Sequence, residues 1–169
     1  MNDQLFIELI DLLNKKDFIN NWLNNGYQKN PLLIYGNHGL FKSSLAEYIL
    51  KDYSIIKVDL EFCKSNQHFE NFINLSLNKY SIKMMFENNK QNIKALIIDD
   101  LNYILKHDKN LFNSILKWIL ILKKKYKYPI IIIIDDINYP KIKKLLIYLK
   151  ILKIELSKKN IFLLQKNIS

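Results

Sequence analysis

The sequence predicts an α/β domain in which a parallel central sheet lies between two layers of helices. Three largely apolar runs indicate strands of that sheet: Leu32–Tyr35, Lys94–Asp100 with two acids at its end, and Ile130–Ile134. Segments with apolar residues at helical spacing alternate with these runs. Because the runs do not alternate apolar with polar residues, they are typical of parallel strands covered on both faces.

The N-terminal region is expected to be helical. Gln4–Leu13 repeats apolar residues at helical spacing, and Asp3 precedes it as the expected N-cap. Asp17–Leu23 predicts a second, short helix. Asn24-Asn25-Gly26 is expected to end that helix, because Asn and Gly tolerate the left-handed conformation of a C-terminal cap.

Other elements follow from the same patterns. We expect a helix over Lys42–Lys51, a strand within Tyr53–Leu60, a helix over Asn66–Asn78, a loop over Met84–Asn92, a helix over Asn110–Lys125, a lysine-rich helix over Lys141–Leu149, a strand over Lys150–Leu156 and a terminal helix over Lys158–Gln165 capped by Ser157. No solenoid repeat and no linker rich in Pro, Gly or Ser interrupts them, and 169 residues suit one domain.

The chain is strongly basic, with a formal net charge of +10. It contains no arginine, so all 26 basic residues are lysines, and Ile and Asn are abundant. This composition is typical of an AT-rich coding sequence, so the charge alone does not show nucleic-acid binding. The densest basic segments, residues 123–127 and 140–144, suit either nucleic acid or the solvated end of a helix.

Several function classes are excluded or disfavoured. Cys63 is the sole cysteine, so an intrachain disulfide framework or a cysteine-rich zinc site is impossible. The first residues carry acids and lack the basic stretch of a signal peptide. Wholly apolar runs such as Ile130–Ile134 are too short to cross a bilayer. We therefore expect a soluble, intracellular protein with no membrane partner.

A glycine-bearing turn joins the first predicted strand to the helix that follows it. Gly36, four residues, Phe41, Lys42 and Ser43 match G-x-x-x-x-G-K-[ST] except that Phe41 replaces the second glycine. Backbone N–H groups of such a turn attract phosphate, and the lysine adds a charge. The expected phosphate-binding residues are Gly36, Asn37, His38, Gly39, Leu40, Phe41, Lys42, Ser43 and Ser44. The alternative is an ordinary strand-to-helix turn.

Paired acids follow two other predicted strands. Asp99 and Asp100 end the run at 94–100, and Asp135 and Asp136 follow Ile130–Ile134. Carboxyl ends of parallel strands gather at one edge of a sheet, where ligands bind. With Lys42-Ser43 nearby, Asp99 suits a Mg²⁺ site, and Asp135 and Asp136 either face the same pocket or pair at the surface with lysines.

These motifs, in this order, resemble the AAA+ ATPase core of the large subunit of replication factor C, the sliding-clamp loader. WLNN at 22–25 is similar to the tryptophan-bearing helix before the loop, and residues 77–86 followed by KALIIDDLNYI are similar to the approach to the Walker B strand. PIIIIIDDINYPKIKKL at 129–145 is the most specific segment. The resemblance covers residues 22–156.

The resemblance implies a three-layer αβα P-loop NTPase fold with residues 1–28 as N-terminal helices, 29–156 as the nucleotide-binding core and 157–169 as a terminal helix or the start of a truncated lid. ATP and Mg²⁺ are the implied cofactors. Ser43 and Asp99 match metal-binding positions, while Asp100 stands where the family has a glutamate and Asp135 where it has a sensor asparagine. Lacking arginine, the chain would receive an arginine finger from a neighbour.

The implied function is that of a clamp-loader-like ATP-binding subunit in DNA replication, with weak or absent hydrolysis because three pocket positions are substituted. Its implied partners are other loader subunits, a sliding clamp and primer-template DNA. An alternative is an inactive AAA+ scaffold subunit of a replication complex. Another is a different P-loop ATPase, such as a helicase loader or initiator.

Overall fold

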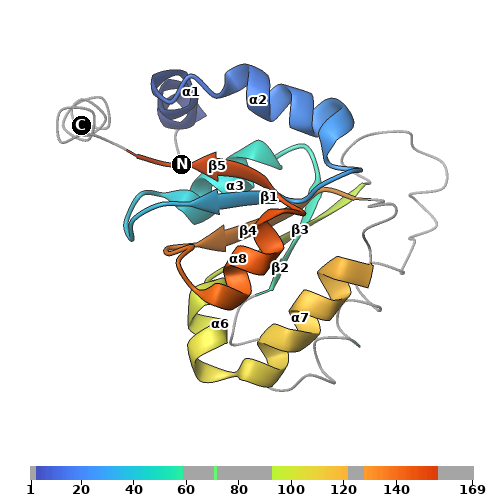
Figure 1. Ribbon diagram of the computed structural model, residues 1–169. Helices are drawn as coiled ribbons and strands as arrows, with labels where there is room; N and C mark the ends of the chain where they lie inside the picture. Colours follow the sequence, from blue (N-terminus) through green and yellow to red (C-terminus); the bar gives the residue numbers. More distant parts are fainter. Residues whose placement is uncertain (1–2, 59–70, 72–92, 122–127, 156–169) are drawn as a thin grey trace.

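A five-stranded parallel sheet forms the centre of the computed structural model, which describes residues 3–58, 71, 93–121 and 128–155 (Figure 1). Its strands are β1 (Leu32–Tyr35), β2 (Ser54–Val58), β3 (Lys94–Ile98), β4 (Ile130–Ile134) and β5 (Lys150–Lys153). They lie in the order β2-β3-β4-β1-β5, and every neighbouring pair is parallel. The predicted α/β class is therefore confirmed.

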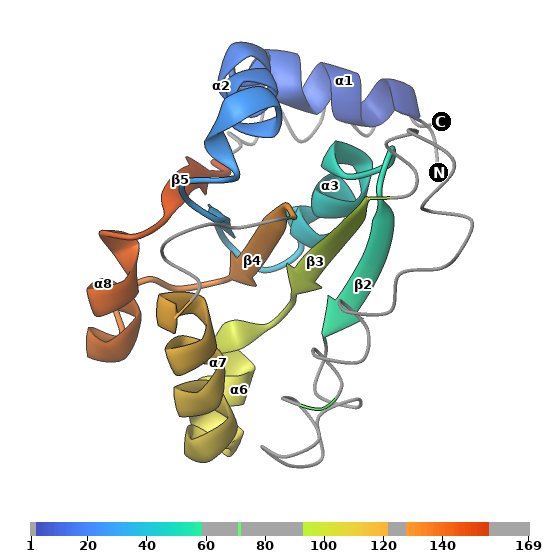
Figure 2. The ribbon, with the colours of Figure 1, turned by 90° about the vertical axis from the view of Figure 1, so that its right-hand side faces the viewer.

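Helices cover the two faces of the sheet (Figure 2). One face carries α1 (Asp3–Leu12), α2 (Lys16–Asn21) and α3 (Lys42–Ile49), and the other carries α6 (Leu101–His107), α7 (Lys109–Ile121) and α8 (Pro140–Leu146). The described part of the molecule is thus a three-layer αβα sandwich.

Each central strand contributes to both hydrophobic cores. On β4, Ile131 and Ile133 pack with α1, α2 and α3, while Ile130, Ile132 and Ile134 pack with α6, α7 and α8. Every residue of β4 is at most 1% exposed. Full burial of such side chains stabilises a fold by about 1.5–3 kcal/mol each. This two-sided burial is the physical reason for the continuous apolar runs in the sequence.

Strand register aligns the carboxyl ends of the three central strands. Tyr35 pairs with Ile134, and Ile98 pairs with Ile132. Gly36, Asp99 and Asp135, which follow these strands, therefore leave the sheet at the same edge. The convergence predicted from the sequence is observed.

The N-terminal helices differ from expectation in their ends. Asp3 lies inside α1 rather than before it. The second helix does not end in a left-handed cap, because a π-helical turn (η1, Trp22–Gly26) continues it, with the N–H of Tyr27 donating to the carbonyl of Trp22 at 2.8 Å. A Cβ at Gly26 would approach the Trp22 indole to 3.2 Å, so close packing explains the glycine there.

Other differences lie after β3. Helix α6 was not expected, because its seven residues follow the acids directly and are too short for a clear periodic pattern. Helix α7 begins near the predicted position, where Asp108 Oδ1 accepts the N–H groups of Asn110 and Leu111 at 2.9 and 2.8 Å. The expected helices over 66–78 and 158–165 and the loop over 84–92 lie outside the described residues, apart from residue 71. The proposed boundaries at 28/29 and 156/157 stay predictions.

Candidate functional site

A hollow of about 320 Å³ lies at the carboxyl edge of the central strands. It is lined by residues 38–44 of the glycine turn and α3, by Asp99 and Asp100 after β3, and by Ile133 and Asp135 of β4 and its end. Three separate stretches of sequence thus form one crevice. Of the predicted loop residues, Gly36 and Asn37 do not line it, although Asn37 bonds to a residue that does.

Lys42 is the charged centre of this crevice. Only 6% of the residue is exposed, and its Nζ donates to the carbonyl oxygen of Asn37 at 2.8 Å. The same Nζ lies 2.7 Å from Oδ1 of Asp135. A buried ammonium needs such acceptors, since a charge removed from water is costly unless it is paired and hydrogen-bonded.

The turn adopts a left-handed backbone at two places. Gly39 has φ +83°, and Phe41 has φ +54° and ψ +27°. Phe41 therefore takes a conformation that glycine adopts more readily, at the position where the phosphate-loop motif has glycine. Phe41 lines the crevice and is 46% exposed, so its ring is not buried within it.

Gly36 has a different role in the turn. A Cβ at this position would stand 2.4 Å from the carbonyl oxygen of Ile154, just after β5. Backbone rarely approaches so closely except at glycine. Gly36 is therefore required for the turn to pass the end of β5.

Helix α3 presents its first turn to the crevice. Ser43 and Ser44 are half-buried there, directly after Lys42. Helix N-termini attract anions through their free N–H groups and dipole. Among the described residues, the Ser43 hydroxyl has no hydrogen-bond partner, so it is available to a ligand.

The acids after β3 are held close to one another. Oδ1 of Asp99 accepts the backbone N–H of Asp100 at 2.9 Å, and Asp100 itself is left-handed with φ +48°. Partial burial raises the pKa of the Asp100 carboxyl, and the charges of Asp99 and Asp135 raise it further. The charges of His38 and Lys42 lower the pKa of the same carboxyl. These acids therefore share one electrostatic environment.

The two acids after β4 face different surroundings. Asp135 pairs with Lys42, and its Oδ2 lies 3.6 Å from Nδ1 of the exposed His38. Asp136 Oδ1 instead accepts the N–H and side-chain Nδ2 of Asn138, at 2.8 and 2.7 Å. Of the predicted pair, Asp135 alone belongs to the crevice. Pairing of these acids with Lys141 is not observed, since Lys141 donates to Asn113 at 3.2 Å.

Asn102 is a site residue that the sequence reasoning missed. This residue, on α6, is only 8% exposed, and its Oδ1 accepts the N–H groups of Asp135 and Asp136 at 2.8 and 3.3 Å. Its Nδ2 donates to the carbonyl of Asp136 at 2.7 Å. Asn102 thereby joins the helix after Asp99-Asp100 to the loop that carries Asp135. The available signal was a polar residue directly beside the buried Leu101 of a core-facing helix.

The residues present fit a Mg²⁺–polyphosphate group. The described residues hold no group of three His, Cys, Asp or Glu side chains able to bind a metal by themselves. Mg²⁺ is usually bound through one or two protein ligands together with substrate phosphates and water. Ser43 and Asp99, on two sides of the crevice, are compatible with that mode.

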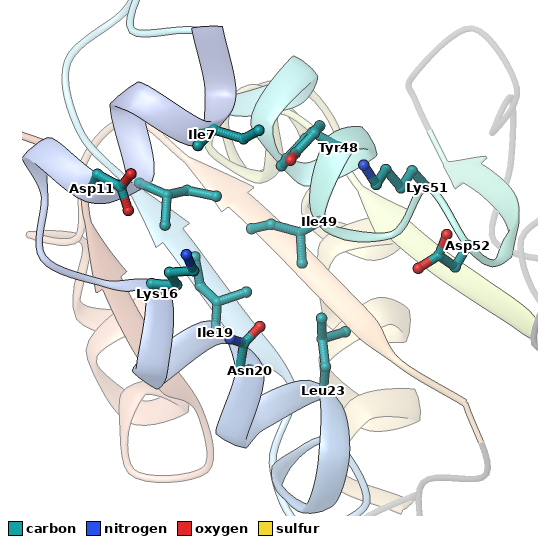
Figure 3. A pocket seen from close by; sticks show the side chains of 11 residues that line it. Ile7, Asp11, Lys16, Ile19, Asn20, Leu23, Tyr48, Ile49, Lys51 and Asp52 are labelled. Atoms are coloured by element: carbon teal, nitrogen blue, oxygen red, sulfur yellow. The ribbon is translucent and has the colours of Figure 1, made fainter. Parts of the chain in front are cut away.

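A second hollow, of about 350 Å³, lies between α1, α2 and the far end of α3 (Figure 3). Its lining includes Ile7, Ile19 and Ile49, with Asp11 and Lys16 among its polar residues. It adjoins the C-terminal end of α3, whereas Lys42 begins that helix. Neither the glycine turn nor the N-terminus of α3 lines this second hollow, so it lacks the anion-binding features of the first crevice.

No described helix of the chain is both long enough and apolar enough to cross a membrane.

The parallel sheet, the Lys-Ser helix start and the acid at the end of β3 together define a P-loop NTPase core of the AAA+ class. The model of the bacterial DnaA ATPase domain family matches residues 13–120, which is well over half of the chain. The chain therefore belongs to the bacterial DnaA ATPase domain family. Among the curated proteins, none matches it.

Solved structures share the fold at low sequence identity. A chain of the HORMA:CdnC:Trip13 complex of E. coli MS115-1 matches with a TM-score of 0.53 and 15% identity, covering 99% of this chain and 64% of that one. The Aeropyrum pernix ORC1 protein in complex with DNA matches with a TM-score of 0.57 and 13% identity, covering 95% of this chain and 48% of that one. Hsp104 with ATPγS and casein matches with a TM-score of 0.58 and 11% identity, covering 91% of this chain and 29% of that one. The chain spans less than two thirds of each of these chains.

Proposed function

We propose that the chain is the nucleotide-binding module of a DNA-replication assembly, binding an adenine nucleotide with Mg²⁺ and turning it over weakly or not at all. The observation that carries the proposal is the placement of Lys42, Ser43 and Asp99 around one crevice at the carboxyl edge of the sheet. The ATPase family to which the chain belongs supports adenine nucleotide as the ligand.

The site residues have separate roles in this proposal. The turn at 36–41 and the first turn of α3 hold the phosphates by backbone N–H groups. Lys42 supplies the positive charge, and Ser43 and Asp99 hold Mg²⁺ directly or through water. Bound Mg²⁺ would neutralise phosphate charge. Asp100 is shorter than the glutamate that commonly orients water, so turnover is expected to be slow.

The replication role is supported by the family match and by the structural likeness to the ORC1 protein in complex with DNA. An initiator-like or helicase-loader-like module is thus the first candidate. Clamp loading is the second candidate, supported by the segment at 129–145 that resembles the replication factor C large subunit. In the structure Pro140, within that segment, begins α8. In the clamp-loading role, the partners of the chain would be other loader subunits, a sliding clamp and primer-template DNA.

Nucleotide binding is tested by titrating ADP and ATP, with and without Mg²⁺, into the chain and into Lys42→Ala. We expect binding that strengthens with Mg²⁺ and is lost in Lys42→Ala. Lys141→Ala is the matched control, because it removes the same charge from an exposed position on α8. Failure of the unaltered chain to bind either nucleotide would refute the proposal and favour the scaffold alternative.

The two replication candidates are separated by adding partners to the nucleotide-loaded chain. A ring-shaped sliding clamp together with primer-template DNA is expected to stimulate turnover if the chain belongs to a loader. Nucleotide-dependent binding of the chain to duplex DNA, with no effect of the clamp, would instead support the initiator-like role.

A further inference from the structure

The crevice contains an internal competitor for the terminal phosphate of a nucleotide. Asp135 Oδ1 lies 2.7 Å from Nζ of Lys42, which also donates to Asn37 at 2.8 Å. A lysine ammonium has three donors, so one of them remains for a bound phosphate. In a phosphate-binding loop the lysine normally reaches both the β- and the γ-phosphate. Here the Asp135 carboxylate already occupies one of the Lys42 donors that would reach those phosphates.

The charges around Lys42 also disfavour additional negative charge. Asp99, Asp100 and Asp135 line the same crevice, and Lys42 is the one lysine among the described lining residues. His38 reaches Asp135 but is 92% exposed, so water screens its contribution. A γ-phosphate adds about one further negative charge close to the Asp135 carboxylate, and like charges a few ångströms apart repel strongly in a partly buried site.

Asp135 is not placed to withdraw easily. Asn102 holds the backbone N–H of Asp135 at 2.8 Å and both backbone groups of the next residue, Asp136. Because Asn102 is buried on α6, the loop after β4 is fastened to the core of the domain. The carboxylate therefore stays beside Lys42 unless its side chain alone rotates into the crevice or out of it.

We propose that this pocket selects nucleoside diphosphates over nucleoside triphosphates, because the Asp135 carboxylate occupies the Lys42 donor that a γ-phosphate requires. The inference rests on the proposed nucleotide binding and adds the identity of the preferred ligand. A diphosphate uses the loop N–H groups and the remaining Lys42 donor without displacing Asp135. A triphosphate must either break the Lys42–Asp135 pair or accept a carboxylate beside its terminal phosphate.

The test is calorimetric titration of the full chain with ADP and with a non-hydrolysable ATP analogue, each in the presence of Mg²⁺. The unaltered chain is expected to bind ADP about tenfold or more tightly than the triphosphate. Asp135→Asn keeps an oxygen acceptor for Lys42 and removes the charge, so it is expected to tighten triphosphate binding and bring the ratio to within about threefold. Asp135→Ser is a second neutral variant should the first fold poorly.

Asp136→Asn is the matched control, since it makes the same substitution one residue away on a carboxylate that faces Asn138. It is expected to leave the ADP preference unchanged. Equal affinities in the unaltered chain, or a preference that survives both neutral variants at Asp135, would overturn diphosphate selection while leaving nucleotide binding intact. Absence of binding by either nucleotide to the chain and to the folded Asp135 variants would overturn the proposed function as well.

Discussion

Asn102 and Asp135, separated by 33 residues, are joined by a 2.8 Å hydrogen bond from the backbone N–H of Asp135 to the Asn102 side-chain oxygen. The amide nitrogen of the same side chain donates to the Asp136 carbonyl at 2.7 Å. One buried side chain thus satisfies both a donor and an acceptor of the loop that follows β4. The ion pair between Lys42 and Asp135 depends on this loop being held in place.

The first prediction concerns Asn102 itself. Asn102→Ala leaves buried backbone groups of Asp135 and Asp136 without their partner, so the free energy of unfolding should fall by about 2 kcal/mol or more. Urea denaturation followed by circular dichroism measures this loss. Asn110→Ala, at an exposed position on α7, should change the free energy by less than about 0.5 kcal/mol. Equal effects of the two substitutions would show that the hydrogen bonds of Asn102 contribute little.

The second prediction concerns Phe41, whose left-handed backbone is unfavourable for a residue with a Cβ. Phe41→Gly and Phe41→Ala both remove the half-exposed ring, but only glycine relieves the backbone conformation. The glycine variant should therefore be more stable than the alanine variant by about 1 kcal/mol, despite the greater entropy of its unfolded chain. Thermal unfolding of the two variants side by side provides the measurement. A more stable alanine variant would contradict the left-handed conformation.

The strands and their common edge could be predicted from the sequence because burial on both faces leaves a continuous apolar run such as Ile130–Ile134. Parallel connection then places the residues after each run together, whatever the details of packing. For the same reason Asp99, Asp135 and the Lys42 helix start could be expected in one crevice.

Other features depended on side-chain geometry that no local pattern encodes. The residues alone left open whether Asp135 and Asp136 both face the pocket or both lie at the surface. In the structure the two acids differ, because Asp136 makes an Asx turn with Asn138. The role of Asn102 depends on contacts with a loop far along the chain. The π-helical turn begins at the buried Trp22, whose indole N–H donates to the carbonyl of Asn30 at 2.8 Å.

The third prediction contrasts two glycines of the same turn. At Gly36 an added Cβ would stand 2.4 Å from the Ile154 carbonyl, a backbone atom that cannot rotate away. At Gly39 an added Cβ would meet open space, but the backbone there has a φ of +83°. Gly36→Ala should therefore cost more than about 3 kcal/mol or prevent folding, because β5 must shift. Gly39→Ala should cost only about 1 kcal/mol, from backbone conformation alone.

Denaturant unfolding of the two variants, with expression as soluble protein as a first measure, tests this contrast. A Gly36→Ala variant as stable as Gly39→Ala would mean that β5 does not pass close to the turn in solution. Because neither substitution changes charge, nucleotide affinity of the Gly39→Ala variant also reports whether the turn itself binds phosphate. We expect that affinity to fall, because alanine disfavours the left-handed backbone with which the turn would bind phosphate.

The last prediction concerns the pH dependence of stability at Asp100, whose pKa is raised by burial and by the nearby carboxylates of Asp99 and Asp135. A raised pKa means that the folded protein binds the proton more tightly than the unfolded chain does. The contribution of Asp100 to stability is therefore fully present below the ordinary aspartate pKa of about 3.9, and it is lost as the pH rises through the folded-state value. At neutral pH the ionised carboxylate destabilises the fold.

Asp100→Asn removes this charge, and asparagine tolerates the left-handed backbone at this position. The variant should be more stable than the unaltered chain at pH 7, and the difference should shrink toward zero near pH 3. Since Asp100 is only partly buried, solvent screening limits the gain to less than about 1 kcal/mol. Urea unfolding at several pH values compares both proteins, with Asp11→Asn, on the exposed face of α1, as a control for general charge effects. A difference that does not vary with pH, or a variant that is less stable at pH 7, would show that the carboxylate cluster is not repulsive in the folded protein.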